Sequence, residues 1–324
     1  DGANMTAKAI AVRQQLVDPD NRLHGSEQAR EALYAIGAAY HTIAADGLAA
    51  EWYLRFARSH PAAPQAPVAA SNAVVLLLAT GEVEPALKAA RSFRHTYGTT
   101  QPRWDAQIQL ALAQHHASSG SSTGTAHAIA LLERSRVAFA EHATGDVRLQ
   151  AQLLLAQLYD DAERGDEAAT AWLMLRQAAS DLDTLRKDLA ATGEPRRQRA
   201  RRLRSAKEAI SVALLQHADR LRSQVVVAPP SYARAHSPSD VAAYVNEEIG
   251  SWLAGRTQAI EAAAAAYHAV VELDGGRPSP AHALVAGAAV GGMWAELVTA
   301  AATASHPPTW ELPGVIATSD PPVA

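Results

Sequence analysis

A pairing of alanine with phenylalanine recurs at a fixed distance in the first half of the chain. The segment LAAEWYLRF at residues 48–56 is followed 37 residues later by PALKAARSF at residues 85–93, with Ala and Phe at the same two places. Self-similarity with a period of roughly 20 to 50 residues is typical of stacked repeats, in which each unit buries its apolar face against its neighbours. The recurrence therefore predicts a stack of similar units rather than one closed core.

The residues around the first of these segments have the spacing of a helix hairpin. Gly37 is small enough to let a second helix approach, and Tyr40 fills the gap one turn later. Ala49 is the matching small residue on the second helix, and Pro61 ends that helix because proline has no backbone N–H to donate. These positions resemble the signature of the tetratricopeptide-repeat (TPR) family, whose repeats are helix hairpins of about 34 residues.

Less regular copies of the hairpin follow along the chain. Each keeps a small residue where its two helices are expected to touch, at Ala86, Ala113, Ala128, Ala156 and Ala168. The stretch GSSTG at residues 120–124 is expected to be a flexible turn inside the third copy. The resemblance implies an all-α fold, namely a TPR-like right-handed α-solenoid of about four helix hairpins followed by a C-terminal helical unit.

Breaks in the pattern divide the chain into four predicted segments. These are an N-terminal helix or cap at 1–26, the TPR-like repeats at 27–179, a C-terminal long-helix unit at 180–305 with a Pro-rich crossover near 227–238, and an extended Pro-rich tail at 306–324. Ser239 and Asp240 are expected to cap the helix after the crossover. The last helix should pack through Gly291 and Trp294, and no segment is predicted to span a membrane.

The order of elements in residues 180–305 has a resemblance of its own. A long helix and a Pro-rich crossover precede WLAGRTQAIEAAAAAYHAVVEL at 252–273, and a helix with the sequence GGMW at 291–294 follows. This layout resembles the C-terminal units of large envelope-associated TPR proteins of myxobacteria and related bacteria, some of which are linked to gliding motility. The resemblance implies a periplasmic or envelope-associated protein, with a cytoplasmic location as the alternative.

The composition fits closely packed helices and excludes several kinds of site. Of the 324 residues 48% are hydrophobic but only 5% are aromatic, and nearly a quarter are alanine, the strongest helix former. A β-sandwich or barrel would call for more β-branched and aromatic residues. The chain has no cysteine, which excludes disulfides, iron–sulfur clusters, thiolate zinc sites and a cysteine nucleophile.

The TPR resemblance implies a concave groove lined by the first helix of each hairpin. Alignment to the repeat places a polar, amide-rich set of side chains there: Tyr34, His41, Gln107, Gln114, Gln150, Gln157 and Asp160. Amide side chains both donate and accept hydrogen bonds and suit the backbone of a bound peptide. Tyr34 and Ala38 stand where carboxylate-clamp members of the family have Lys and Asn, which argues against capture of a C-terminal carboxylate.

A basic segment follows the repeats. Between Arg186 and Arg222 the chain has eleven Lys or Arg residues against four Asp or Glu. The candidate basic face consists of Arg196, Arg197, Arg201, Arg204 and Lys207. It is either a solvated helix face that pairs with acids of a neighbouring repeat or a surface for an anionic partner or lipid. No aromatic residue lies among these cations to stack on bases, and the net charge is −4, which argues against nucleic acid.

The sequence offers no catalytic machinery. It contains no phosphate-binding loop, dinucleotide fingerprint, nucleophile elbow or HExxH motif, and adjacent His115 and His116 cannot form one facial metal site on a helix. No catalytic, cofactor-binding or metal-binding residue is predicted. We expect a non-catalytic protein–protein interaction scaffold whose partners are other proteins or peptides, as part of a bacterial envelope or periplasmic assembly connected with motility. The alternatives are a cytoplasmic TPR adaptor or regulator fragment, an anionic-surface binder that uses the Arg-rich helix, and an enzyme accessory or hydrolytic role that uses acidic or His residues in the groove.

Overall fold

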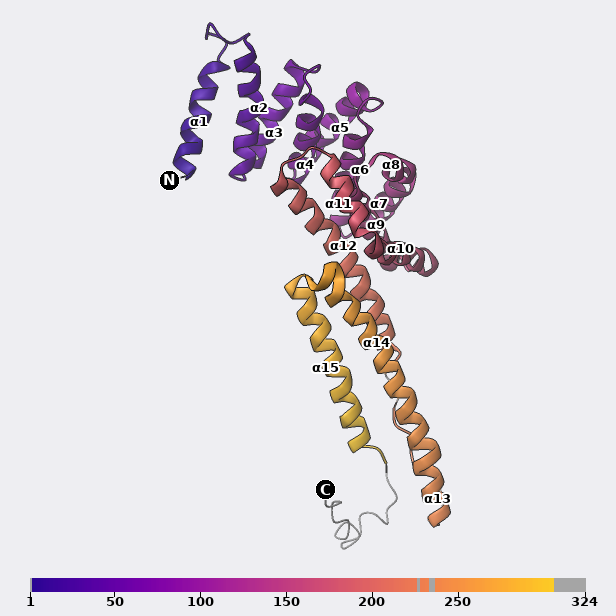
Figure 1. Cartoon of the computed structure of the whole chain (residues 1–324). Helices are drawn as coiled ribbons and strands as arrows, with labels where there is room; N and C mark the ends of the chain where they lie inside the picture. The colour runs from indigo at the N-terminus through magenta and orange to yellow at the C-terminus, as the bar shows by residue number, and fades with distance from the viewer. Residues whose placement is uncertain (1, 226–227, 233–236, 306–324) are drawn as a thin grey trace. The chain divides into compact units, whose positions relative to one another are not determined.

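All regular secondary structure in the described residues is helical. A computed structural model of the chain describes residues 2–225, 228–232 and 237–305 (Figure 1). The all-α part of the predicted fold class is confirmed. The predicted tail at 306–324 and much of the predicted crossover lie outside the described residues, and residues 228–232 form no regular structure.

The chain divides into two compact units. Residues up to Met174, together with Asp183–Ala206, form the first unit, and Leu175–Leu182 with the residues from Lys207 onward form the second. The division therefore falls within the long helix rather than at residue 180, since the start of that helix groups with the repeats.

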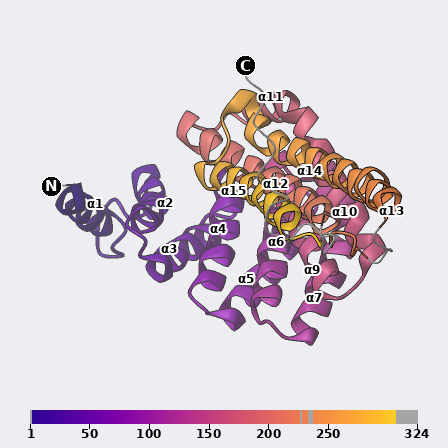
Figure 2. The ribbon, with the colours of Figure 1, turned by 90° about the horizontal axis from the view of Figure 1, so that it is seen from below.

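Consecutive helices from α1 to α9 pack side by side, each on the next (Figures 1 and 2). The bounds of these helices are α1 (Gly2–Leu16), α2 (Glu27–Thr42), α3 (Asp46–Ser59), α4 (Ala66–Ala79), α5 (Val83–Tyr97), α6 (Pro102–Ser118), α7 (Ser122–Arg134), α8 (Arg136–His142) and α9 (Gly145–Asp161). They are followed by α10 (Gly165–Gln177), η1 (Ala178–Asp181), α11 (Leu182–Ala191) and α12 (Arg196–Ser223), of which η1, the end of α10 and the later part of α12 belong to the second unit. In addition α4 packs on α6, and α6 packs on α9. Helices α4, α6 and α9 therefore form a row of their own.

Small residues lie where the helices of the first unit touch. The predicted contact residues are all 0% exposed: Ala49, Ala86, Ala113, Ala128, Ala156 and Ala168. At Gly37 a Cβ atom would lie only 2.8 Å from Cδ1 of Tyr53, so α2 and α3 approach too closely for any side chain there. The predicted packing role of these positions is confirmed.

Two details of the third hairpin differ from the prediction. The stretch at 120–124 is largely helical, because Ser121 caps α7 by accepting a hydrogen bond at 3.0 Å from the backbone N–H of Gly124. The expectation of a flexible turn through residue 124 is therefore wrong, and the turn is confined to the residues before the cap. A short additional helix, α8, lies between α7 and α9, and its one buried side chain is Phe139.

The second unit is built around the rest of α12 with α13 (Pro238–Ala243), the π-helical turn η2 (Tyr244–Ile249), α14 (Gly250–Gly276) and α15 (Pro280–Ala302). Its core includes Ala218 of α12, Ile260 and Tyr267 of α14, and Met293 of α15. The expected cap at Ser239 and Asp240 is wrong, because the cap is Ser237, whose hydroxyl accepts from the backbone N–H of Asp240 at 3.1 Å.

Helix α15 differs from the sequence expectation in two ways. A Cβ atom at Gly291 would meet nothing within 4 Å, and Trp294 is 38% exposed, so the predicted packing through this pair is wrong. By length and composition α15 is also apolar enough to cross a membrane, which the sequence analysis did not expect. Glycines interrupt its apolar run, but they leave the helix continuous.

Candidate binding groove

A hollow of about 900 Å³ lies within the first unit. Helices α2, α4, α6 and α9 contribute side chains to it, as do the α11–α12 connection and the first three turns of α12. On α6 the lining residues Gln107, Ala111 and Gln114 recur at spacings of four and three, which places them on one face of the helix. The opposite face of α6 buries Leu112 and Ala113 in the core. We call this hollow the groove.

Five of the seven predicted groove residues line the groove: Tyr34, His41, Gln107, Gln114 and Gln150. The other two do not. Gln157 lies in a separate cleft, and the Oδ2 atom of Asp160 accepts a hydrogen bond at 2.6 Å from Nε1 of Trp172. The structure thus brings together the predicted residues of α2, α6 and the start of α9, and directs those of the end of α9 elsewhere.

The start of α12 is held beside α9 by a half-buried ion-pair network. Arg202 donates from Nε to Oδ2 of Asp146 at 2.8 Å and from Nη2 to Oδ1 at 2.6 Å, and also bonds to Thr144 Oγ1. Its Nη1 atom donates to Oε1 of Glu194 at 2.6 Å. Burial opposes the charge on Arg202, but the hydrogen bonds to the two carboxylates more than offset this and raise its pKa above the ordinary value.

Two further bonds complete this attachment. Arg103 at the start of α6 donates to the same Glu194 oxygen at 2.5 Å, and Gln150 donates from Nε2 to the backbone oxygen of Ser205 at 2.8 Å. The amide of Gln150 therefore already serves to hold α12, although the residue lies in the groove. Three helices, α6, α9 and α12, are tied together along one wall.

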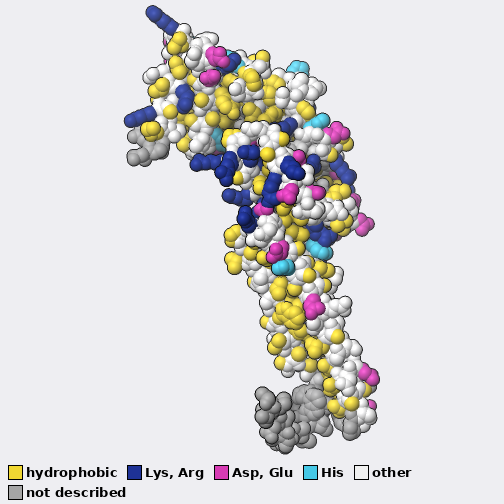
Figure 3. Space-filling view, viewed as in Figure 1, with side chains coloured by type: hydrophobic (Ala, Val, Ile, Leu, Met, Phe, Trp, Pro, Cys, Tyr) yellow, Lys and Arg dark blue, Asp and Glu magenta, His cyan; other side chains and the backbone are white. Residues whose placement is uncertain are grey.

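The predicted basic face does not form one surface. Lys and Arg side chains gather over the start of α12 (Figure 3). Arg197 and Arg201 are exposed and line the groove, whereas Arg196 and Arg204 are exposed outside it. Lys207 belongs to the second unit, where its Nζ atom pairs with Oδ2 of Asp274 at 2.8 Å. The face divides because successive residues of a helix point in different directions.

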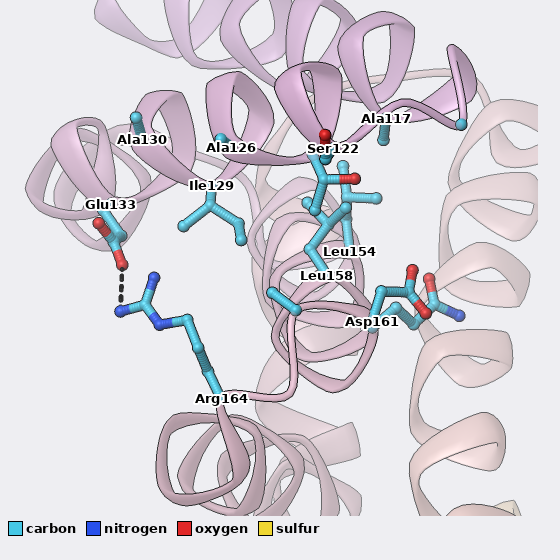
Figure 4. A pocket seen from close by; sticks show the side chains of 14 residues that line it. Ala117, Ser122, Ala126, Ile129, Ala130, Glu133, Leu154, Leu158, Asp161 and Arg164 are labelled. Carbon is cyan, nitrogen blue, oxygen red and sulfur yellow. Dashed lines mark ion pairs between the residues drawn. The ribbon is translucent and has the colours of Figure 1, made fainter.

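A second cleft, for which the sequence has no signal, lies between α7 and α9 with a volume of about 740 Å³ (Figure 4). Ile129, Leu154 and Leu158 give it an apolar floor. At its edge the guanidinium of Arg164 pairs with Glu133 at 3.1 Å and lies 4.5 Å from the ring centre of Tyr159. The charges of Arg164 and Glu133 therefore satisfy one another at this edge of the cleft.

The ring of Tyr159 shares this cluster. Its hydroxyl donates to Oε1 of Glu133 at 2.9 Å, and burial together with that bond raises the pKa of Tyr159 to about 12. An acid–base role near neutral pH would require a pKa much closer to the working pH. The cluster therefore fixes the end of α7 against the turn that leads into α10.

Among the described residues, no group of three or more His, Cys, Asp or Glu side chains is placed to hold a metal ion. The rings of His115, His116 and His127 lie near one another: the ring centres of His115 and His116 are 6.0 Å apart, and those of His116 and His127 are 5.7 Å apart.

Comparison with known proteins assigns no family. No family model matches the chain, and no curated protein and no solved structure matches it either.

Proposed function

We propose that this chain is a non-catalytic interaction scaffold whose first unit is a TPR-like right-handed solenoid that holds a peptide segment of another protein. The observation that carries the proposal is the gathering of Tyr34, His41, Gln107 and Gln114 in a single groove. These residues come from α2 and α6, which are separated in the chain by three other helices. A stack that aligns the first helices of successive hairpins would bring such residues together.

The packing of the first unit supports a TPR-like arrangement. Hairpins α2–α3, α4–α5 and α6–α7 each pack within themselves, and α4, α6 and α9 also pack on one another in order. In a helical solenoid the first helices of successive hairpins form such a row and line the inner surface. The close approach of Gly37 to Tyr53 lies at the position where the TPR signature has its small residue.

The chemistry of the groove supports a peptide as the ligand. Gln107 is half-buried and Gln114 is exposed, and neither side chain forms a hydrogen bond with another described residue. Each amide therefore has a donor and an acceptor to offer. An extended peptide has backbone N–H and C=O groups that need such partners when it leaves water.

The proposal also includes a location within the cell, namely the envelope or periplasm. The layout of α12, α14 and α15 supports an envelope or periplasmic assembly connected with motility, and the apolar length of α15 is compatible with that setting. A cytoplasmic adaptor or regulator remains the alternative. Fractionation of cells that express the full natural protein separates the two, because recovery in the cytoplasmic fraction alone would contradict the envelope assignment.

Selection of peptides on the purified chain tests the groove. Peptides that bind the parent are selected from a displayed random library. Each should bind the variant Gln107→Ala/Gln114→Ala about tenfold more weakly than it binds the parent, because the variant lacks two amides of the groove. The matched control is Gln28→Ala/Gln65→Ala, which removes two exposed glutamines outside it. The control should retain parental affinity. Failure of any peptide to bind, or equal binding to both variants, would contradict the proposed function.

A further inference from the structure

The charges that line the groove are unequal. Four arginines and two carboxylates contribute to it. The carboxylates of Asp146 and Glu194 are both engaged by Arg202, and Arg103 also pairs with Glu194. Arg197 and Arg201 remain, and neither forms an ion pair with any other residue that the structure describes. The groove therefore has two exposed cations that its own acids do not neutralise.

The spacing of these two arginines matches that of side chains on an extended peptide. Residues four apart on a helix lie on one face about 6 Å apart along its axis. In an extended chain, alternate side chains point to the same side and are separated by about 6.6 Å. Arg197 and Arg201 can therefore meet two acidic residues that have one residue between them. The planar guanidinium suits a carboxylate because it can donate two parallel hydrogen bonds.

The two arginines stand on a rigid support. The bonds from Arg202 to Asp146 and from Gln150 to Ser205 fix the rotation of this part of α12. That rotation directs Arg197 and Arg201 into the groove and leaves Arg196 and Arg204 outside it. A ligand then meets cations whose helix is already ordered, which reduces the entropy lost on binding.

The aromatic residues of the groove favour a peptide over a nucleic acid. The guanidinium of Arg103 already lies over the ring of Trp104, 4.9 Å from its centre. Tyr34 packs against Phe56 with its ring centre 5.5 Å away. Single-stranded nucleic acid is usually held by free aromatic faces together with many phosphate contacts. Two unpaired cations and two engaged rings suit a short acidic segment better.

We infer that the groove selects an extended acidic segment of a partner protein, with Arg197 and Arg201 binding two Asp or Glu side chains in an acidic–any–acidic pattern. This inference rests on the proposed function, since it names the kind of peptide that the groove takes. Gln107 and Gln114 across the groove would hold the backbone of the same segment.

Fluorescence anisotropy with a defined probe tests the inference. The probe is a labelled dodecapeptide of alternating Glu and Ser, compared with one of alternating Gln and Ser. The parent chain should bind the Glu peptide at least about tenfold more tightly than the Gln peptide, and added salt should reduce the difference. Arg197→Glu/Arg201→Glu should abolish the preference.

Arg196→Glu/Arg204→Glu is the matched control, because it makes the same charge change on exposed positions of the same helix outside the groove. It should bind the Glu peptide within about twofold of the parent. Arg197→Gln/Arg201→Gln removes the two positive charges without reversing them and should also reduce the preference for the Glu peptide. Thermal unfolding followed by circular dichroism checks that each variant is folded.

The outcomes separate the two proposals. If peptides selected on the parent depend on Gln107 and Gln114 but carry no acidic residues, the acidic preference is wrong and the groove proposal survives. If no peptide binds in either experiment, the proposed function itself fails. If oligothymidylate or phosphatidylglycerol vesicles bind as tightly as the Glu peptide, and Arg197→Glu/Arg201→Glu and Arg196→Glu/Arg204→Glu weaken that binding equally, the α12 arginines form a general anion-binding surface and the inference is overturned.

Discussion

Arg202 holds Asp146 through two parallel hydrogen bonds of 2.8 Å and 2.6 Å, across 56 residues of chain. The side chains are only 14% and 11% exposed. This pair joins the start of α12 to the first turn of α9 and so determines which residues of α12 face the groove. The orientation of Arg197 and Arg201 depends on it.

Loss of this contact should be costly. Arg202→Met leaves the carboxylate of Asp146 buried without its partner, and we expect the free energy of unfolding to fall by about 3–5 kcal/mol. Arg202→Met/Asp146→Leu removes both charges and should recover most of that loss. Urea unfolding provides the measurement, with Arg204→Met as an exposed control that changes stability by about 0.5 kcal/mol or less. Equal stability of the single variant and the control would contradict a structural role for the pair.

Substitution by alanine should have opposite effects on stability at two glycines that lie in helices. Gly37→Ala places a methyl group 2.8 Å from the ring of Tyr53 and should destabilise the first unit by about 1–3 kcal/mol through overpacking. Gly291→Ala meets open space and should stabilise α15 by about 0.5–1 kcal/mol, because alanine favours helix over glycine. Hydrogen exchange read by mass spectrometry separates the response of each helix. An increase in stability on Gly37→Ala would mean that α2 and α3 do not pack as described.

These glycines also mark how far the sequence predicts the fold. Buried alanines such as Ala49 and Ala86 were predictable because the repeat spacing depends on local helix contacts. In the sequence, Gly291 has the same spacing to an aromatic residue as the small contact residues of the repeats. Its surroundings, however, depend on which face of α15 meets the core of the second unit, and no local pattern specifies that face. The start of α7 was missed for a different reason, since the capping role of Ser121 competes with the turn tendency of its serine and glycine neighbours.

The candidate site was predictable to a similar extent. The repeat register placed Gln107 and Gln114 in the groove, since residues of one helix face share their direction. Asp160 was predicted to line the groove too, but its carboxylate accepts a hydrogen bond from the indole N–H of Trp172 on the next helix. The separation of Arg197 from Arg196 required the rotation of α12, which is set by a contact with a distant residue. Tertiary contacts of this kind have no sequence period.

Acid should weaken the fold partly through His116. Burial lowers its pKa below the ordinary 6.5, and the charges of His115 and His127 add to this effect. The unfolded chain then binds a proton more readily than the folded one, so the contribution of His116 is present above about pH 6.5 and is lost as pH falls through its folded-state pKa. His116→Gln should therefore reduce the loss of stability between pH 7 and pH 5. An unchanged pH dependence by urea unfolding would contradict this.

Cross-linking of a bound peptide tests the central claim most directly. A peptide selected on the parent chain is given a photoreactive benzophenone group, irradiated in the complex, and mapped by mass spectrometry. We predict cross-links to the groove-facing residues of α2, α6 and the start of α12, and competition by the unlabelled peptide. Cross-links that cluster instead on α15 or in the cleft between α7 and α9 would show that the groove is not the binding site.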